Sequence, residues 1–111
     1  MKSSEIKINV TTDAMNLPET MNWQATDSGV DGINPLKAVM LSVWDAKENT
    51  TLKIDLWTKD MLVDDMKQFF HQTLISMANT LERATNEDKM AGDMRDFCDY
   101  FAEKMGLKEE K

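Results

Sequence analysis

The sequence predicts an α+β domain: a four-stranded antiparallel sheet made of two hairpins, followed by two antiparallel C-terminal helices packed on one face of the sheet. Two observations predict this arrangement. Apolar and polar residues alternate in several segments between about residues 4 and 57, which is the period of strands with one wet face. From about residue 63, apolar residues recur at spacings of three and four, which is the period of a helix.

Length and charge restrict the class of protein further. The chain has 111 residues, of which 41% are hydrophobic and 30% charged, and this fits a single domain over residues 1–111. Its net charge of −7 argues against a nucleic-acid partner, because such binders need a basic face. No apolar run approaches the roughly 18 residues of a membrane span, and the N-terminus lacks the apolar stretch of a signal peptide. The single cysteine fits a reducing compartment, so we expect a cytoplasmic protein that is not inserted in a membrane.

The first hairpin is predicted from two alternating segments, residues 4–11 and 20–26. Asn16 and Pro18 lie between them and are typical of a turn. The side chains of the second segment that we expect to point inward are Met21, Trp23 and Ala25.

The second hairpin is predicted from its second strand. The apolar run of residues 38–44 could be a helix or a strand by periodicity alone, but a clear strand over residues 52–57 follows a turn-like connection. If Trp44 lies opposite Thr51, one face of the hairpin carries Val39, Leu41, Val43, Leu52, Ile54 and Leu56. A slip of one residue would reverse the faces of the first strand, so the pattern leaves the register open.

The same register places Met40, Trp44 and Trp57 together on the polar face of this hairpin. Trp and Met are enriched in interfaces, so these three residues are a candidate patch for a protein partner or for self-association. The alternative is that Trp57 ends its strand and tucks under a loop or a helix start, because Trp is usually well buried.

Two helices are predicted over residues 63–84 and 86–105. Thr85 can accept a bond from a free backbone N–H at the second helix start, and Gly106 is a natural stop. The short connection favours antiparallel packing. Most methionines of the two apolar stripes are expected to fill the core: Met66, Met77, Met90, Met94 and Met105.

No catalytic, cofactor-binding or metal-binding residue is predicted. His71 and Cys98 could form a nucleophile pair if they were adjacent, but no third orienting group is apparent, so both are expected to be structural. Residues 27–32 resemble a calcium loop but lack its third and twelfth ligands. The acids Asp93, Asp96 and Asp99 alternate with basic residues, as on a solvated helical face.

Four segments resemble the family of gliding motility-associated GldC proteins. They are MLSVWD (40–45), KIDLWTKDM (53–61), MKQFFHQTL (66–74) and MRDFCDYFAEK (94–104), in this order and spacing. The resemblance extends over nearly the whole chain. It departs at Leu62, where the family often has proline, and this affects the entry into the first helix.

The resemblance implies a small cytoplasmic protein of Bacteroidota that is associated with gliding motility and with the type IX secretion apparatus that accompanies it. It carries over no catalytic motif, so the expected function is that of a non-enzymatic accessory protein. Its expected partners are proteins of this machinery, with a second copy of the chain, in a homo-oligomer, as a further candidate. The alternative is a small acidic holdase or adaptor for exported proteins, because the SecB export chaperone also has a four-stranded antiparallel sheet followed by two helices. Fold alone does not give function.

Overall fold

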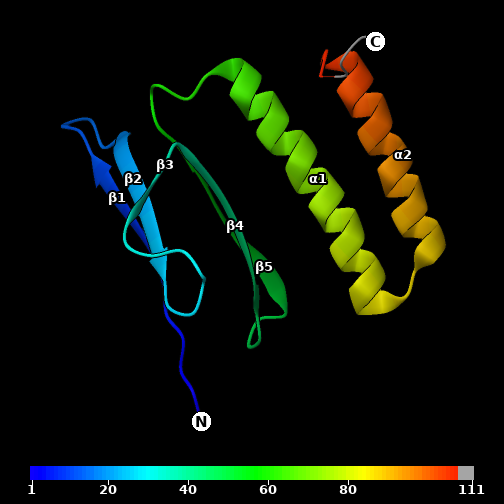
Figure 1. Ribbon diagram of the computed structural model, residues 1–111, viewed down its shortest axis with the longest axis horizontal. Coiled ribbons are helices and arrows are strands. Elements are labelled where there is room, and N and C mark those ends of the chain that lie inside the picture. The colour runs from blue at the N-terminus through cyan, green and yellow to red at the C-terminus, as the bar shows by residue number, and fades with distance from the viewer. Residues whose placement is uncertain (108–111) are drawn as a thin grey trace. The chain divides into compact units, whose positions relative to one another are not determined.

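A computed structural model describes residues 1–107, which form two compact units (Figure 1). The first unit is Met1–Met61 and the second begins at Leu62. The elements are β1 (Ile6–Thr12), β2 (Pro18–Ala25), β3 (Asn34–Leu36), β4 (Ala38–Asp45), β5 (Thr50–Trp57), α1 (Val63–Thr85) and α2 (Asp88–Lys104). The α+β class is confirmed. The single domain over residues 1–111, and the packing of the helices on the sheet, stay predictions.

The first hairpin forms as predicted. β1 pairs antiparallel with β2, so that Ile8 lies opposite Trp23 and Val10 opposite Met21 on one face of the sheet. Met21 is 3% exposed and is the main apolar anchor of this sheet. The opposite face is polar, and there the amide of Asn9 donates to that of Asn22 at 2.9 Å. The alternation of the sequence therefore translates directly into one apolar and one wet face.

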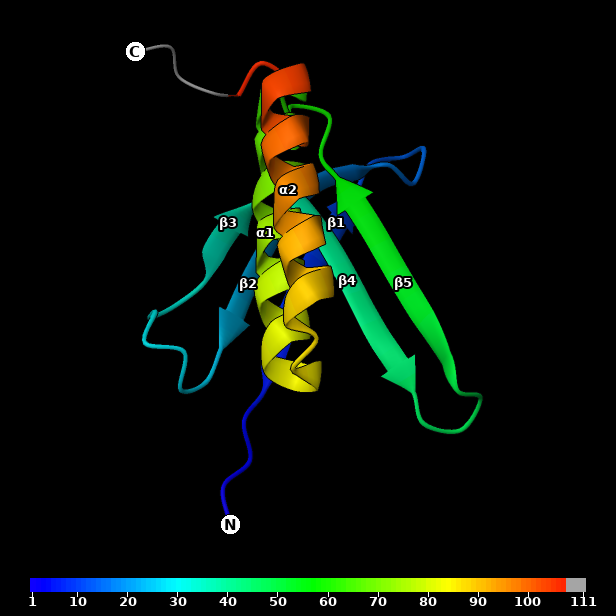
Figure 2. The same cartoon turned by 90° about the vertical axis from the view of Figure 1, so that its right-hand side faces the viewer.

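The prediction of one four-stranded sheet is wrong. The strands form a three-stranded sheet in the order β1-β2-β3 and a two-stranded sheet of β4 and β5. A bend at Lys37 separates β3 from β4, and Figure 2 shows these strands running in different directions on either side of it. The pairing of β2 with β3 extends over three residue pairs, one of which joins Asn22 to Pro35. Because proline has no N–H to donate, it limits a strand ladder, and the chain then turns away into the second hairpin.

The β4–β5 hairpin has the register in which Trp44 lies opposite Thr51. The grouping of side chains expected from this register is therefore confirmed. One face is apolar throughout, with Leu41 opposite Ile54 at its centre. The other face is mixed, with Trp57 opposite Ala38 at one end.

The second unit is an antiparallel pair of helices. Asn86 adopts a left-handed conformation after α1, and its N–H donates to the Glu82 carbonyl. Gly106 adopts a left-handed conformation after α2, with φ of 71°. The Thr85 hydroxyl accepts from the Glu87 N–H at 3.2 Å. The second helix does not start at Thr85 as predicted: Thr85 is the last residue of α1, and α2 begins after Glu87 without a side-chain cap. The buried residues of the pair are small: Ala78, Ala91, Cys98 and Ala102.

The expectation that the stripe methionines fill the core is wrong for three of them in this unit. Met77 is 53% exposed, Met90 56% and Met105 39%. Two helices can bury only the narrow seam between them, and here three alanines and Cys98 occupy it. The methionines therefore lie on apolar faces that the helix pair itself does not cover.

Candidate functional site

The three residues of the candidate patch lie on one face of the β4–β5 hairpin, at two places. Met40 lies opposite Asp55 and is therefore a diagonal neighbour of Trp57, which lies opposite Ala38. Trp44 lies opposite Thr51 at the far end, six residues along the strand, or about 20 Å away. The structure brings Met40 and Trp57 together and leaves Trp44 apart from them.

Both tryptophans are exposed. The side chain of Trp57 is 57% exposed and that of Trp44 is 65% exposed, while Met40 is half-buried. Trp57 is therefore not tucked under a loop. Most of an indole in water at a strand end is an unusual surface feature, because Trp is usually well buried.

A groove runs beside Trp57. It encloses about 310 Å³ and its lining is mostly apolar, made of Leu17, Pro18, Asp55, Leu56, Trp57 and Lys59. Leu17 ends the turn between β1 and β2, and Pro18 is the first residue of β2; both are about forty residues away in the sequence. Sequence reasoning missed them, because no periodicity links a turn to the end of a distant strand. A leucine at position 17, next to Pro18 in a turn-like segment, was the one local signal, since turns seldom require a leucine.

An ion pair fastens the two walls of this groove. The Lys59 ammonium contacts the Asp13 carboxylate, which also accepts backbone N–H bonds from Met15 at 2.8 Å and Leu17 at 3.1 Å. The bond from Lys59, followed by those from the backbone of Leu17 and Met15, lowers the pKa of Asp13 to about 2. The same contact raises the pKa of Lys59. The turn that carries Leu17 is thus bound to the segment that follows Trp57.

A buried threonine fixes the other side of Trp57. Thr58 is 3% exposed, and its N–H donates to the Lys37 carbonyl at 2.8 Å. Its hydroxyl lies 2.5 Å from a carboxylate oxygen of Asp60, and this bond is the main cause of the lowered pKa of Asp60. The Lys37 ammonium is 3.8 Å from the same carboxylate. These contacts connect the residues just after β5 to the bend between β3 and β4. The backbone on the C-terminal side of Trp57 is therefore fixed.

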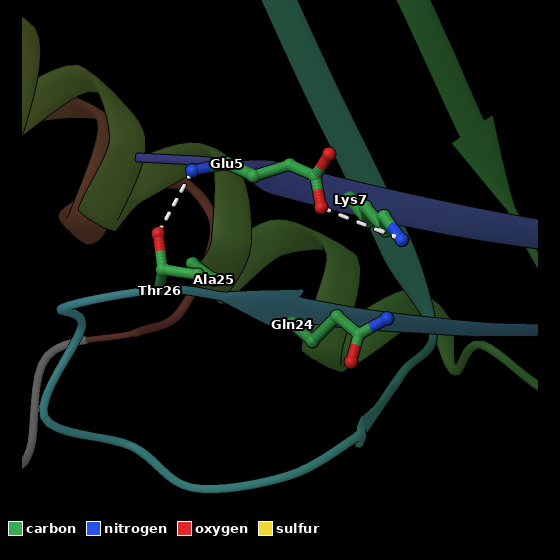
Figure 3. A pocket seen from close by; sticks show the side chains of 5 residues that line it. All are labelled: Glu5, Lys7, Gln24, Ala25 and Thr26. Atoms are coloured by element: carbon green, nitrogen blue, oxygen red, sulfur yellow. Dashed lines mark hydrogen bonds and ion pairs between the residues drawn. The ribbon is translucent and has the colours of Figure 1, made fainter. Parts of the chain in front are cut away.

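A second hollow, of about 160 Å³, lies on the β1–β2 hairpin (Figure 3). The Glu5 N–H donates to the Thr26 hydroxyl at 2.8 Å, and the Glu5 carboxylate is 3.4 Å from the Lys7 ammonium. Gln24 and Ala25 complete the lining. Its charged groups already bind one another, and no nucleophile lies beside a base, so the hollow lacks the groups of a reaction centre.

His71 and Cys98 do not form a nucleophile pair. The imidazole Nε2 is 3.1 Å from the Cys98 backbone carbonyl, which can only accept, so Nε2 carries the proton. The ring stacks on Phe101, with 6.1 Å between centroids. Cys98 is 3% exposed, and burial raises the pKa of its thiol. These contacts join α1 to α2.

The apolar surface of the helix pair includes two shallow grooves. One, of about 260 Å³, lies along α2 and is bounded by Met90 and Phe97, which are 56% and 51% exposed. The other, of about 480 Å³, is bounded by Met77 and Leu81 of α1 and by Met94 of α2. Sequence reasoning assigned these side chains to the core, and it therefore did not consider them as surface.

Among residues 1–107, no group of three or more histidine, cysteine, aspartate or glutamate side chains is placed to hold a metal ion. Within that range, neither helix has the length and apolarity needed to cross a membrane.

Comparison with known proteins places the chain in a family. A family model described as "Gliding motility-associated protein GldC-like" matches residues 18–107. The matched range runs from the first residue of β2 to the end of the described chain, and it includes every lining residue of the Trp57 groove except Leu17. No curated protein and no solved structure gave a significant match.

Proposed function

Because the chain belongs to the family of gliding motility-associated GldC-like proteins, we propose that it is a cytoplasmic, non-enzymatic accessory protein of the gliding machinery and of the type IX secretion apparatus that accompanies it. It acts by binding a protein partner. The binding surface is the Trp57 groove together with Met40, and Trp44 extends it along the same face of the hairpin.

The exposed indole of Trp57 is the observation that carries this proposal. Interface cores are enriched in tryptophan and methionine, and tryptophan is the residue most often found to dominate binding energy. The groove beside it offers Leu17 and Pro18 as an apolar wall, with Asp55 and Lys59 at its rim. An apolar centre with a charged rim is the usual anatomy of a protein interface.

The groove is also pre-formed. The Asp13–Lys59 ion pair and the bonds of Thr58 hold its walls without a partner. A rigid site loses less conformational entropy when it binds. A folded partner of fixed shape therefore suits this groove better than a succession of unfolded chains.

The alternative holdase function is less well supported. It rested on the likeness of a four-stranded sheet followed by two helices to SecB, and the strands instead form two separate sheets. A holdase would bind many unfolded chains, and an accessory protein would bind one folded partner. The two functions therefore differ in the number of proteins that the groove contacts in a cell.

Colony spreading of a gliding bacterium tests the proposal. The gene for this chain is deleted and then replaced by the parent, by Trp57→Ser, or by Tyr100→Ser. Tyr100 is a matched control, because it is 54% exposed and lies on α2, outside the proposed surface. We expect Trp57→Ser to spread poorly at an unchanged protein level, and Tyr100→Ser to spread like the parent. Equal spreading of both variants would contradict the proposed surface.

A further inference from the structure

We propose that two copies of this chain pair antiparallel along the free edges of their β5 strands, about a two-fold axis at Ile54, and form one continuous four-stranded sheet. The order of strands is β4-β5-β5-β4. The pairing does not depend on the motility partner proposed above.

The outer edge of β5 is available for pairing. Within residues 1–107, β5 pairs with β4 alone, over eight residue pairs from Ala38–Trp57 to Asp45–Thr50. Such an edge presents a row of backbone N–H and C=O groups without strand partners, which is a template for another strand. Natural edges are usually short or bulged, and the pairing of β5 is regular along all eight residues.

The side-chain pattern restricts the register of such a pair. In the proposed dimer the apolar faces of both hairpins lie on the same side of the joint sheet. This requires a two-fold axis normal to the sheet that passes between one residue and the same residue of the second copy. Centring on Ile54 places Leu52 of one copy opposite Leu56 of the other, so apolar side chains meet apolar ones. If one strand slid by one residue along the other, Ile54 of one copy would lie opposite Lys53 of the other, which is a charged side chain.

Charge selects the centre among the remaining registers. With the axis at Ile54, Lys53 of each copy lies opposite Asp55 of the other copy. This gives two ion pairs between the copies. An axis at Lys53 would place two ammonium groups together, and an axis at Asp55 would place two carboxylates together. Opposite charges across a strand pair stabilise it and like charges destabilise it. Within one chain the Lys53 ammonium already lies 3.3 Å from the Asp55 carboxylate, and the two side chains are 50% and 45% exposed. The pairing would exchange this one contact within each copy for two contacts between the copies.

The net charge of −7 does not prevent this pairing. Repulsion between two acidic copies acts over distances that physiological salt screens beyond about 8 Å. The Lys53–Asp55 pairs act at contact, where screening is weakest. The local complementarity therefore decides the register, and the net charge lowers the overall affinity.

The other free edges match themselves less well. On β1, centring on Ile8 places Lys7 opposite Asn9, and no acid faces the lysine. On β4, centring on Leu41 places Asp45 opposite Lys37, but Lys37 lies in the bend outside the strand. β5 is the edge with both charges inside the strand.

The pairing would also unite the divided patch. Trp44 lies opposite Thr51 in the hairpin, and the proposed register places Thr51 opposite Trp57 of the second copy. Trp44 of one copy and Trp57 of the other then share a row, two strand spacings or about 10 Å apart. Within one chain the two residues are about 20 Å apart along the strand. The second copy thus completes a surface with two tryptophans that one chain cannot form.

A mixing experiment tests the register. Lys53→Glu alone places two acids opposite each other in both pairs, and Asp55→Lys alone places two bases opposite each other. A mixture of the two variants restores both ion pairs. By sedimentation we expect the parent to dimerise, each variant alone to dimerise about tenfold more weakly, and the mixture to recover the affinity of the parent. A monomeric parent, or a mixture no tighter than its components, would overturn the proposal.

Cysteine cross-linking tests the axis itself. Ile54→Cys places two thiols directly opposite each other, at the Cα separation of about 4.5–5.5 Å that a disulfide accepts. Leu52→Cys is the matched control, because it has the same 52% exposure and lies on the same face of the same strand. Its two thiols would be four residues apart along the strands, or about 13 Å. Under oxidation we expect a covalent dimer from Ile54→Cys alone. Equal cross-linking of both variants, or of neither, would contradict an axis at Ile54.

Discussion

The carboxylate of Asp13, in the turn between β1 and β2, forms an ion pair with the ammonium of Lys59, just after β5. This contact joins two segments that are more than forty residues apart, and Trp57 lies at the groove between them. The position of Leu17 beside Trp57 in the candidate surface therefore depends on an ion pair between two residues that lie outside the strands.

Acid should loosen this contact in a defined range of pH. The pKa of Asp13 is lowered to about 2 from an ordinary 3.8, so the pair contributes fully above about pH 3.8 and is lost as the pH falls through about 2. Carboxyl titration by NMR should show Asp13, the one aspartate of this turn, titrating at about 2. Lys59→Gln removes the main cause of the shift, so the pKa of Asp13 should rise toward 3.8. An Asp13 that titrates near 3.8 in the parent would show that the pair does not form.

The Thr58 hydroxyl should hold the pKa of Asp60 down. Thr58→Val keeps the shape of the buried side chain and removes its donor, while Thr58→Ser keeps the donor and removes a methyl group. We expect the pKa of Asp60 to rise in Thr58→Val and to stay low in Thr58→Ser, because the bond from this hydroxyl is the first cause of the shift. Thermal unfolding should occur at a lower temperature in Thr58→Val. Indistinguishable titration curves for the two variants would contradict this role.

Trp57 should contribute little to stability. A side chain that is 57% exposed loses little burial when it is truncated, so Trp57→Ser should change the free energy of unfolding by no more than about 0.5 kcal/mol. Urea denaturation measures this directly. A loss of several kcal/mol would mean that the indole is a core residue, and the binding surface would then have to be sought elsewhere.

Cys98 should be unreactive in the folded protein. Its thiol is 3% exposed, and burial raises its pKa, so the reactive thiolate is scarce. A thiol reagent should label it slowly in buffer and rapidly in urea. Cys98→Ala should cost about 1 kcal/mol, since it removes one buried atom from the seam between the helices. Rapid labelling of the native protein would show that the helix pair is open at this position.

Local patterns predicted the strands and helices well, and they failed where distant segments meet. The alternation around Leu41 and Ile54 was sufficient to place the faces of the β4–β5 hairpin, because a period of two leaves few registers. β3 was missed, because three residues that include Pro35 carry no readable period. The division into two sheets follows from the bend at Lys37, which no pattern of hydrophobicity reports.

The candidate site was predictable only in part. Trp57 stood out in the sequence, because it breaks the alternation of its strand on the polar side. The opposite wall of the groove, with Leu17, could not be predicted, since it depends on how the turn folds back on the end of β5. The distance between Trp44 and the other two residues follows from the register, which the sequence left open.

Photo-cross-linking at position 57 in living cells tests most directly whether this face binds one protein partner. Benzoylphenylalanine replaces Trp57 in one strain and Tyr100, which is similarly exposed, in a control strain. Beyond any adduct with a second copy of the chain, we expect one discrete adduct with another protein at position 57 and none at position 100. A ladder of many adducts at position 57 would instead indicate a holdase, and the absence of any foreign adduct there would contradict the proposed surface.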